Sequence, residues 1–166
     1  MSVDERMVHD IVQKVMANMQ ISGSVSGMHG VFKDMNDAIN ASIEAQKKVC
    51  TMTLDQREQI ISLIRKKTHE NAEILANMGV NETGMGNVGD KILKHHLTAD
   101  KVPGTEDIST IAWSGDRGLT LVEMGPFGVI GAITPATNPS ETVICNCIGM
   151  LAGGNTVVFN PHPNAK

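Results

Sequence analysis

The segment Thr134–Thr142 has the clearest chemical potential in the sequence, because it places hydroxyl and amide side chains between and beside two prolines. It follows the apolar run Gly128–Thr134, which is typical of a buried strand, and it leads into a helical pattern. The carboxyl ends of parallel strands are where α/β sheets bind their ligands. The side chains of Thr137, Asn138 and Ser140 could therefore hydrogen-bond a cofactor or a developing oxyanion. The alternative is an ordinary strand-to-helix loop in which Asn138 only caps the helix.

A second candidate segment, Asn160–Pro163, follows the strand candidate Thr156–Phe159. It also lies at the carboxyl end of a strand, and we expect it beside the first segment. The two flanking prolines favour an extended conformation at His162. The imidazole of His162 could contact the phosphates or the ribose of a nucleotide, or it is simply a surface residue.

The histidine and cysteine spacings predict neither a metal site nor a nucleophile in this chain. His95 and His96 are adjacent and cannot share one helix face. Cys145 and Cys147 fall in a predicted helix, where their spacing points the two thiols in different directions. Cys147 shares the apolar face and is predicted to be a small core residue. No cysteine has an evident histidine or aspartate to orient it.

Hydrophobic spacing and turn residues predict the elements that position these segments. A βαβ unit with a right-handed crossover spans the two candidate segments. Helices precede it, so the fold class is α/β. The predicted helices are 34–49, a longer one that Thr53 and Gln56 open and 81–86 breaks, a short one at 90–97, and 140–152; a further strand is predicted at 119–123.

Residues 1–20 form the clearest amphipathic helix, because apolar side chains recur at spacings of three and four. Residues 21–30 read as a flexible linker, since 21–27 are rich in Gly and Ser. A short helix on a tether has no partner of its own for its apolar stripe. We expect it to dock on another protein; the alternatives are that it folds back or pairs with a copy of itself.

Bulk composition excludes several classes of function. A net charge of -4 over 166 residues gives no electrostatic footprint for nucleic acid. No stretch is long and apolar enough to span a bilayer. Three cysteines, an odd number, favour a reducing cytosol over a disulfide-stabilised secreted protein.

The chain resembles the coenzyme-A-acylating aldehyde dehydrogenases of bacterial microcompartments, which act in ethanolamine, propanediol, choline or fucose breakdown. The resemblance covers nearly all of residues 30–166. It implies that 31–166 is the N-terminal part of an NAD- and CoA-binding domain, the incomplete start of a Rossmann-like fold. The motifs that carry it are 81–86, Pro103-Gly104 with Glu106-Asp107, 125–131, 134–139 and 161–163.

The resemblance implies NAD-dependent oxidation of a short aldehyde, acetaldehyde or propionaldehyde, to acyl-CoA by a homo-oligomer. A cysteine thiolate attacks the aldehyde in this family, and none of the three cysteines here matches it. We expect that cysteine beyond residue 166, so the chain alone is expected to be inactive. The alternative is a catalytically dead fragment that acts only as a targeting or binding module.

The same resemblance assigns roles to residues of both candidate segments. Asn138 becomes the candidate oxyanion donor, although hydrolytic relatives place that Asn one position earlier, where this chain has Thr137. Hydrolytic relatives also carry a ribose-binding Lys near Asn160, and its absence here fits a pocket that admits both NAD and coenzyme A. The implied cofactor-binding residues are Thr134, Pro135, Ala136, Thr137, Asn160, His162 and Pro163.

The N-terminal helix and its linker match the pattern of an encapsulation peptide. The resemblance therefore implies that residues 1–20 bind a microcompartment shell protein, and that the enzyme lies in the lumen of a cytoplasmic microcompartment.

Overall fold

The computed structural model describes residues 30–166. The predicted helix 1–20, and the linker up to residue 29, lie outside this range. The chain divides into two compact units, residues 1–41 and 42–166. The elements are α2 (Met35–Val49), α3 (Leu54–Thr83), α4 (Val88–Lys101), the 3-10 helix η1 (Thr105–Asp107), β1 (Ile111–Gly115), β2 (Gly118–Val122), β3 (Val129–Ile133), α5 (Pro139–Ala152) and β4 (Thr156–Asn160).

Helix α3 begins at the predicted capping box and ends within the predicted break at 81–86. Thr53 Oγ1 accepts from the Gln56 backbone N–H at 3.2 Å, and Gln56 Oε1 accepts from the Thr53 N–H at 3.0 Å. The helix continues through Thr83 and stops at Gly84, whose φ of 67° is left-handed. This end lies inside the predicted break 81–86, at the first of its two glycines, because glycine can adopt the left-handed conformation.

Helix α4 is longer than the predicted 90–97. Asn87 caps it by accepting from the Asp90 N–H at 2.9 Å. It continues to Lys101 and ends before Pro103, which cannot continue a helix. The extra turns bring Ala99, which is fully buried, against the neighbouring helix.

Two arginines of α3 hold the carboxyl ends of the neighbouring helices. Arg57 Nη1 donates to the Ala152 carbonyl of α5 at 2.7 Å. Arg65 donates to the Ala99 carbonyl of α4, and to that of Val102 at 2.8 Å. Carbonyls in the last turn of a helix have no partner within the helix, so these guanidinium groups satisfy them. The two arginines lie about two turns apart on α3, and together they fix α4 and α5 along it.

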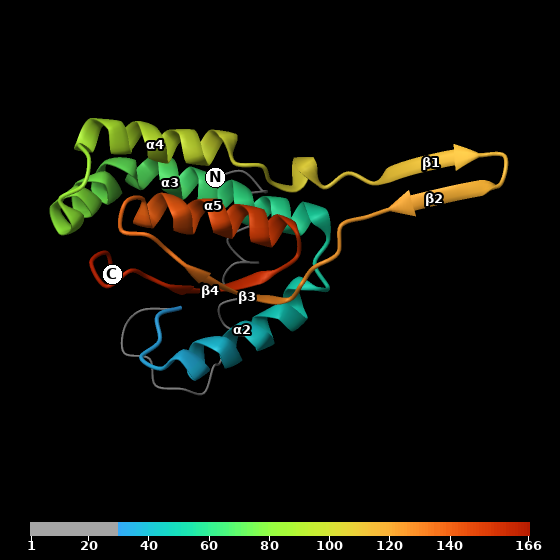
Figure 1. Cartoon of the computed structure of the whole chain (residues 1–166), viewed down its shortest axis with the longest axis horizontal. Helices are drawn as coiled ribbons and strands as arrows, with labels where there is room; N and C mark the ends of the chain where they lie inside the picture. The colour runs from blue at the N-terminus through green and yellow to red at the C-terminus, as the bar shows by residue number, and fades with distance from the viewer. Residues whose placement is uncertain (1–29) are drawn as a thin grey trace, which may run out of the picture. The chain divides into compact units, whose positions relative to one another are not determined.

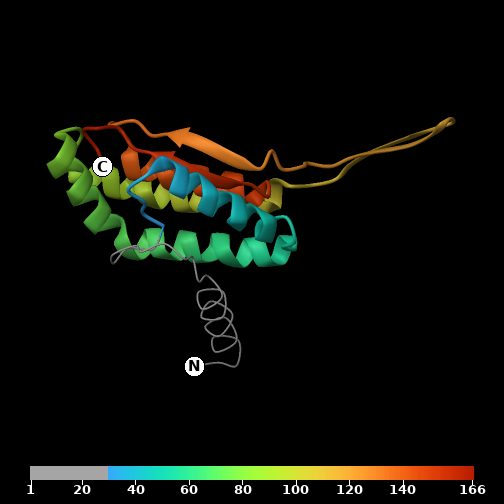
Figure 2. The same ribbon diagram turned by 90° about the horizontal axis from the view of Figure 1, so that it is seen from below.

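The predicted βαβ unit is confirmed. Strands β3 and β4 pair in parallel, with Val129 opposite Thr156 and Ile133 opposite Asn160, and α5 connects them. In Figures 1 and 2, α5 lies between the strands and α3. The core forms at this α3–α5 contact, around Ile61 and Ile148, which are fully buried. Apolar burial between α3 and α5 thus supports the crossover helix that leads out of the first candidate segment.

The strand predicted at 119–123 belongs to a hairpin that the sequence reading missed. Strands β1 and β2 pair antiparallel, with Trp113 opposite Thr120 and a tight turn between Gly115 and Gly118. Every residue of both strands is exposed, and the hairpin projects away from the helices in Figure 1. Its first strand contains Ser114 and Gly115, so it lacks the continuous apolar run that marks a buried strand.

Within residues 30–166, none of the helices combines the length and apolar character needed to cross a membrane.

Candidate functional site

The two candidate segments meet where β3 and β4 end. The Thr134 N–H donates to the Asn160 carbonyl at 3.2 Å, which extends the ladder one step beyond the Ile133–Asn160 pair. The loop 134–138 therefore starts beside the segment 160–163, as the sequence predicts. A ligand at this edge would meet side chains from both segments.

Thr134 is the most buried residue of the loop. It is 1% exposed, and its Oγ1 has no hydrogen-bond partner among residues 30–166. A buried hydroxyl without a partner costs free energy, so such groups in native proteins need an explanation. Ala136 is also buried, whereas Pro135 and Thr137 are exposed. The loop thus alternates between side chains that face inward and side chains that face solvent.

Asn138 occupies the N-cap position of α5 but does not act as a cap. Its backbone has φ -139° and ψ 63°, and its side chain makes no hydrogen bond to the helix. Instead, Asn138 Oδ1 accepts from Lys94 Nζ of α4 at 3.1 Å. Within the described part of the chain, the Nδ2 group donates to no residue. The side chain of Asn138 is therefore not the capping group that the alternative reading of the sequence expects, although Asn138 is the N-cap residue.

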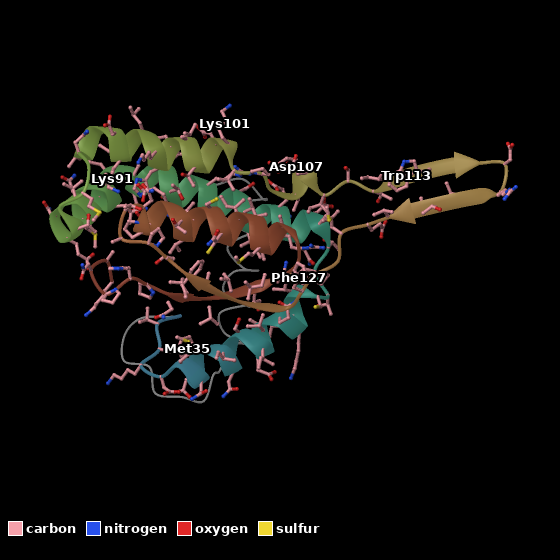
Figure 3. All side chains as sticks on the ribbon, in the orientation of Figure 1. Met35, Lys91, Lys101, Asp107, Trp113 and Phe127 are labelled. Carbon is pink, nitrogen blue, oxygen red and sulfur yellow. The ribbon has the colours of Figure 1, made fainter. Side chains whose placement is uncertain are left out.

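Lysine 91 of α4 anchors the backbone of the loop. Its Nζ donates to the Thr137 carbonyl at 2.8 Å and lies 3.4 Å from Glu141 Oε1. Both charged side chains are buried, at 3% and 8% exposed, so each charge depends on the other and on the carbonyl for its partners. Figure 3 shows Lys91 between α4 and α5. The loop is thereby fixed from outside the βαβ unit.

His95, the next residue on the same face of α4, binds the first turn of α5. Its Nδ1 lies 2.7 Å from the Lys91 carbonyl, and its Nε2 lies 2.8 Å from Ser140 Oγ. A carbonyl only accepts, so Nδ1 carries the proton, and in the neutral ring Nε2 accepts from the Ser140 hydroxyl. His95 is fully buried. This arrangement holds Ser140 and positions the start of α5.

The second segment is open to solvent. Asn160, Pro161, His162 and Pro163 are all exposed. His162 Nδ1 accepts from the Asn164 N–H at 3.1 Å, so the ring is held by a local turn. That leaves Nε2 as the ring atom that can reach a ligand.

The cysteines and histidines behave as structural or surface residues. Burial raises the pKa of the Cys147 thiol, which makes it a poor nucleophile, and Cys50 and Cys145 are exposed. His69 and His96 meet through their Nδ1 atoms at 2.7 Å, and His69 Nε2 lies 2.8 Å from Asp100. In residues 30–166 no group of three or more His, Cys, Asp or Glu side chains converges as a metal site would.

Sequence reasoning missed the contribution of α4 to the site. Lys91, Lys94 and His95 follow an i, i+3, i+4 pattern, which places them on one helix face. The sequence shows this spacing, but a row of polar residues on one helix face usually faces water and does not by itself indicate a site. Only the fold shows that their partners are Thr137, Asn138 and Ser140, about 45 residues further along the chain.

Comparison with known proteins gives one consistent family. The profile of the Aldehyde dehydrogenase family matches residues 14–166. An acetaldehyde dehydrogenase (acetylating) from Bilophila wadsworthia is 47% identical over 171 residues, which cover 98% of this chain and 35% of that protein. The chain spans about a third of the length of the curated relatives that it matches.

Two solved structures are similar to this chain. A propionaldehyde dehydrogenase from the Clostridium phytofermentans fucose utilisation bacterial microcompartment aligns with a TM-score of 0.80 and 78% identity, over 82% of this chain and 31% of that one. A Rhodopseudomonas palustris propionaldehyde dehydrogenase with bound CoA and an acylated cysteine aligns with a TM-score of 0.79 and 49% identity, over 83% of this chain and 32% of that one. The predicted fold class, the start of the aldehyde dehydrogenase fold, is confirmed.

Proposed function

Because this chain belongs to the aldehyde dehydrogenase family, we propose that the protein carrying it oxidises a short aldehyde, acetaldehyde or propionaldehyde, to acyl-CoA with NAD as the hydride acceptor. The names of its relatives support the acylating reaction, since they describe acetylating and CoA-propanoylating dehydrogenases. We propose the same reaction for this protein. Residues 31–166 would form the N-terminal part of its nucleotide-binding domain.

The observation that carries the proposal is the unsatisfied polar edge at the end of β3. The Thr134 hydroxyl is buried without a partner among residues 30–166, and the Asn138 carboxamide makes no hydrogen bond to the helix that it would ordinarily cap. Both groups lie in one loop of five residues, which the adjoining α4 holds in place. Polar groups left free at such a place are typical of a ligand site rather than of a structural turn.

These residues fit a nicotinamide nucleotide and the aldehyde carbonyl. Thr134, Pro135, Ala136 and Thr137 would lie along the nicotinamide side, with Asn160, His162 and Pro163 lining the rest of the pocket. NAD would supply a hydride acceptor, and coenzyme A would accept the acyl group. Asn138 Nδ2–H would donate to the aldehyde oxygen as negative charge develops on it, which lowers the barrier more than it strengthens ground-state binding.

The thiol that attacks the aldehyde is not among the cysteines of this chain. Cys147 is half-buried in α5, where burial raises the pKa of its thiol, and Cys145, which is exposed on the same helix, has no hydrogen-bonded base among residues 30–166. We propose that another part of the longer protein supplies the nucleophile, as the relatives' greater length allows.

Replacement of Asn138 by alanine tests the proposal in the full-length protein that carries this sequence. We expect CoA-dependent NADH formation from propionaldehyde to fall about 10²- to 10³-fold in kcat, the usual effect of removing one oxyanion donor. Asn77→Ala on the exposed surface of α3 is the matched control and should keep the wild-type rate. No CoA-dependent NADH formation by the wild-type protein would contradict the proposed reaction and favour a non-catalytic targeting or binding role.

We further propose that the protein is a homo-oligomer inside a microcompartment. The exposed hairpin β1–β2 supports self-association, because it carries apolar side chains on both faces, with Ile111 and Trp113 on one and Leu119 and Leu121 on the other.

Residues 1–20 would bind a shell protein. A fluorescent protein fused to residues 1–20 should enter microcompartments, and diffuse cytoplasmic fluorescence in cells that contain them would contradict this role.

A further inference from the structure

We propose that Lys94 is a positioning residue for the reaction, because its ammonium group fixes the carboxamide of Asn138 so that the Nδ2 hydrogens face the aldehyde oxygen. The proposal rests on the proposed function and adds to it a residue from a different helix. It starts from one contact, Lys94 Nζ to Asn138 Oδ1 at 3.1 Å.

The carboxamide needs a device of this kind because its two ends are nearly the same size. Rotation by half a turn would exchange the Nδ2 donors for the Oδ1 acceptor, and an acceptor facing the developing oxyanion would repel it. An ammonium group has three donors and no acceptor, so it can pair only with Oδ1. Lys94 therefore selects the orientation in which Oδ1 faces α4 and Nδ2 faces away from it.

Helix α5 does not perform this selection. An Asn at the N-cap ordinarily turns Oδ1 toward a backbone N–H of the first turn, and that bond would fix its orientation. Here the Asn138 side chain makes no such bond, although its carbonyl still accepts from the Thr142 N–H at 3.1 Å. The helix therefore begins normally, and among the described residues the side chain of its N-cap residue is oriented by Lys94.

The neighbours of Lys94 on α4 explain why a single exposed lysine is enough. Lys91 binds the Thr137 carbonyl and His95 binds the Ser140 side chain, so the residues on both sides of Asn138 are already held by the same helix face. Lys94 has only the rotation of one side chain to determine. The charge also polarises the amide and strengthens Nδ2–H as a donor.

Replacement of Lys94 by methionine in the full-length protein tests the inference, because methionine keeps the length and removes the charge. We expect kcat for CoA-dependent propionaldehyde oxidation to fall about fivefold to twentyfold, within the range for a hydrogen bond to a charged group that solvent partly screens. KM for the aldehyde should change less than about twofold, since the interaction matters most as the oxyanion forms. Lys94→Arg should recover most of the rate.

Lys101→Met is the matched control, because it removes the same charge about two turns further along α4. It should leave kcat and KM at their wild-type values. Lys94 is exposed, so both variants should melt at the wild-type temperature. An unchanged kcat in Lys94→Met, or an equal loss in Lys101→Met, would overturn the inference.

The double variant separates this inference from the proposed function. If Lys94 acts through Asn138, then Lys94→Met adds no further loss in an Asn138→Ala background. Independent, multiplying losses would overturn the positioning role while leaving the role of Asn138 intact. A wild-type rate for Asn138→Ala alone would instead contradict the proposed role of Asn138, and with it the inference.

Discussion

At the scale of single residues, the Thr134 hydroxyl lowers the stability of the fold, and we expect it to contribute to ligand binding. Its hydroxyl is buried and has no partner among the described residues, so the fold bears a cost that a valine of the same shape would not. Elsewhere in the loop, the Thr137 carbonyl is paired with Lys91 and Asn138 Oδ1 with Lys94. A cost retained at one atom is typical of a site in which a ligand supplies the missing hydrogen bond.

We therefore predict that Thr134→Val has opposite effects on the stability of the protein and on its affinity for NAD. Without ligand, the variant should be as stable as the wild type or up to about 1 kcal/mol more stable, because an unsatisfied polar group is removed. Its affinity for NAD should fall, which calorimetric titration of the full-length protein would measure. Loss of stability without ligand would show that Thr134 Oγ1 has a structural partner and would remove this argument for a site.

At the scale of elements, the arginines of α3 act mainly as helix caps. Arg65 contacts two backbone carbonyls and also lies 3.3 Å from Glu106. The pKa of Glu106 is lowered chiefly by its own backbone N–H and that of Gly104, and only then by Arg65. A carboxylate with a lowered pKa stabilises the fold above its unfolded pKa, and this contribution disappears as the pH falls through the folded pKa. The backbone carbonyls that Arg65 binds do not titrate, so their contribution to stability does not depend on pH.

Arg65→Met should therefore destabilise the protein with little dependence on pH. We expect a loss of about 1–3 kcal/mol, seen as a lower urea midpoint, because the Ala99 carbonyl is left buried without its partner. Lys66→Met, at the exposed neighbouring position, should have almost no effect. If the loss vanished in acid, the ion pair with Glu106 would be the main contribution, and the capping role would be wrong.

The sequence predicted the elements near the site better than the contacts between them. The capping box at Thr53 and the βαβ unit depend on neighbours or on apolar periodicity, and both are confirmed. The end of α3 lies at a glycine inside the predicted break 81–86, whereas the end of α4 at Lys101 depends on packing and lies beyond the predicted end. The role of the α4 face depends on contacts with residues about 45 positions further along the chain. The spacing of residues within α4 does not identify those partners.

At the scale of the whole molecule, the hairpin β1–β2 is the feature with the least support from its own chain. Every residue of both strands is exposed, and an isolated two-stranded hairpin is marginal in water. Trp113 is 58% exposed and Leu119 is 64% exposed. These surfaces need a covering, which we propose another subunit provides.

Deletion of the hairpin should lower the oligomeric state without unfolding the helical body. Replacing residues 111–122 with a short Gly/Ser linker removes no side chain of the α3–α5 core. Light scattering on the full-length protein should show smaller assemblies, while helical circular dichroism stays close to that of the wild type. Assemblies of unchanged size would contradict the proposed role of the hairpin.

The dependence of the loop on α4 has a consequence for chimeras between dehydrogenases. Lys91 and Lys94 reach the loop, and His95 reaches Ser140 beside it, only because their spacing places them on one face. One inserted residue between them would rotate that face by about 100°. A loop transplanted from a distant relative would meet anchors spaced for a different backbone. The loop and helix α4 should therefore be exchanged together. Grafts that exchange both should retain activity more often than grafts of the loop alone.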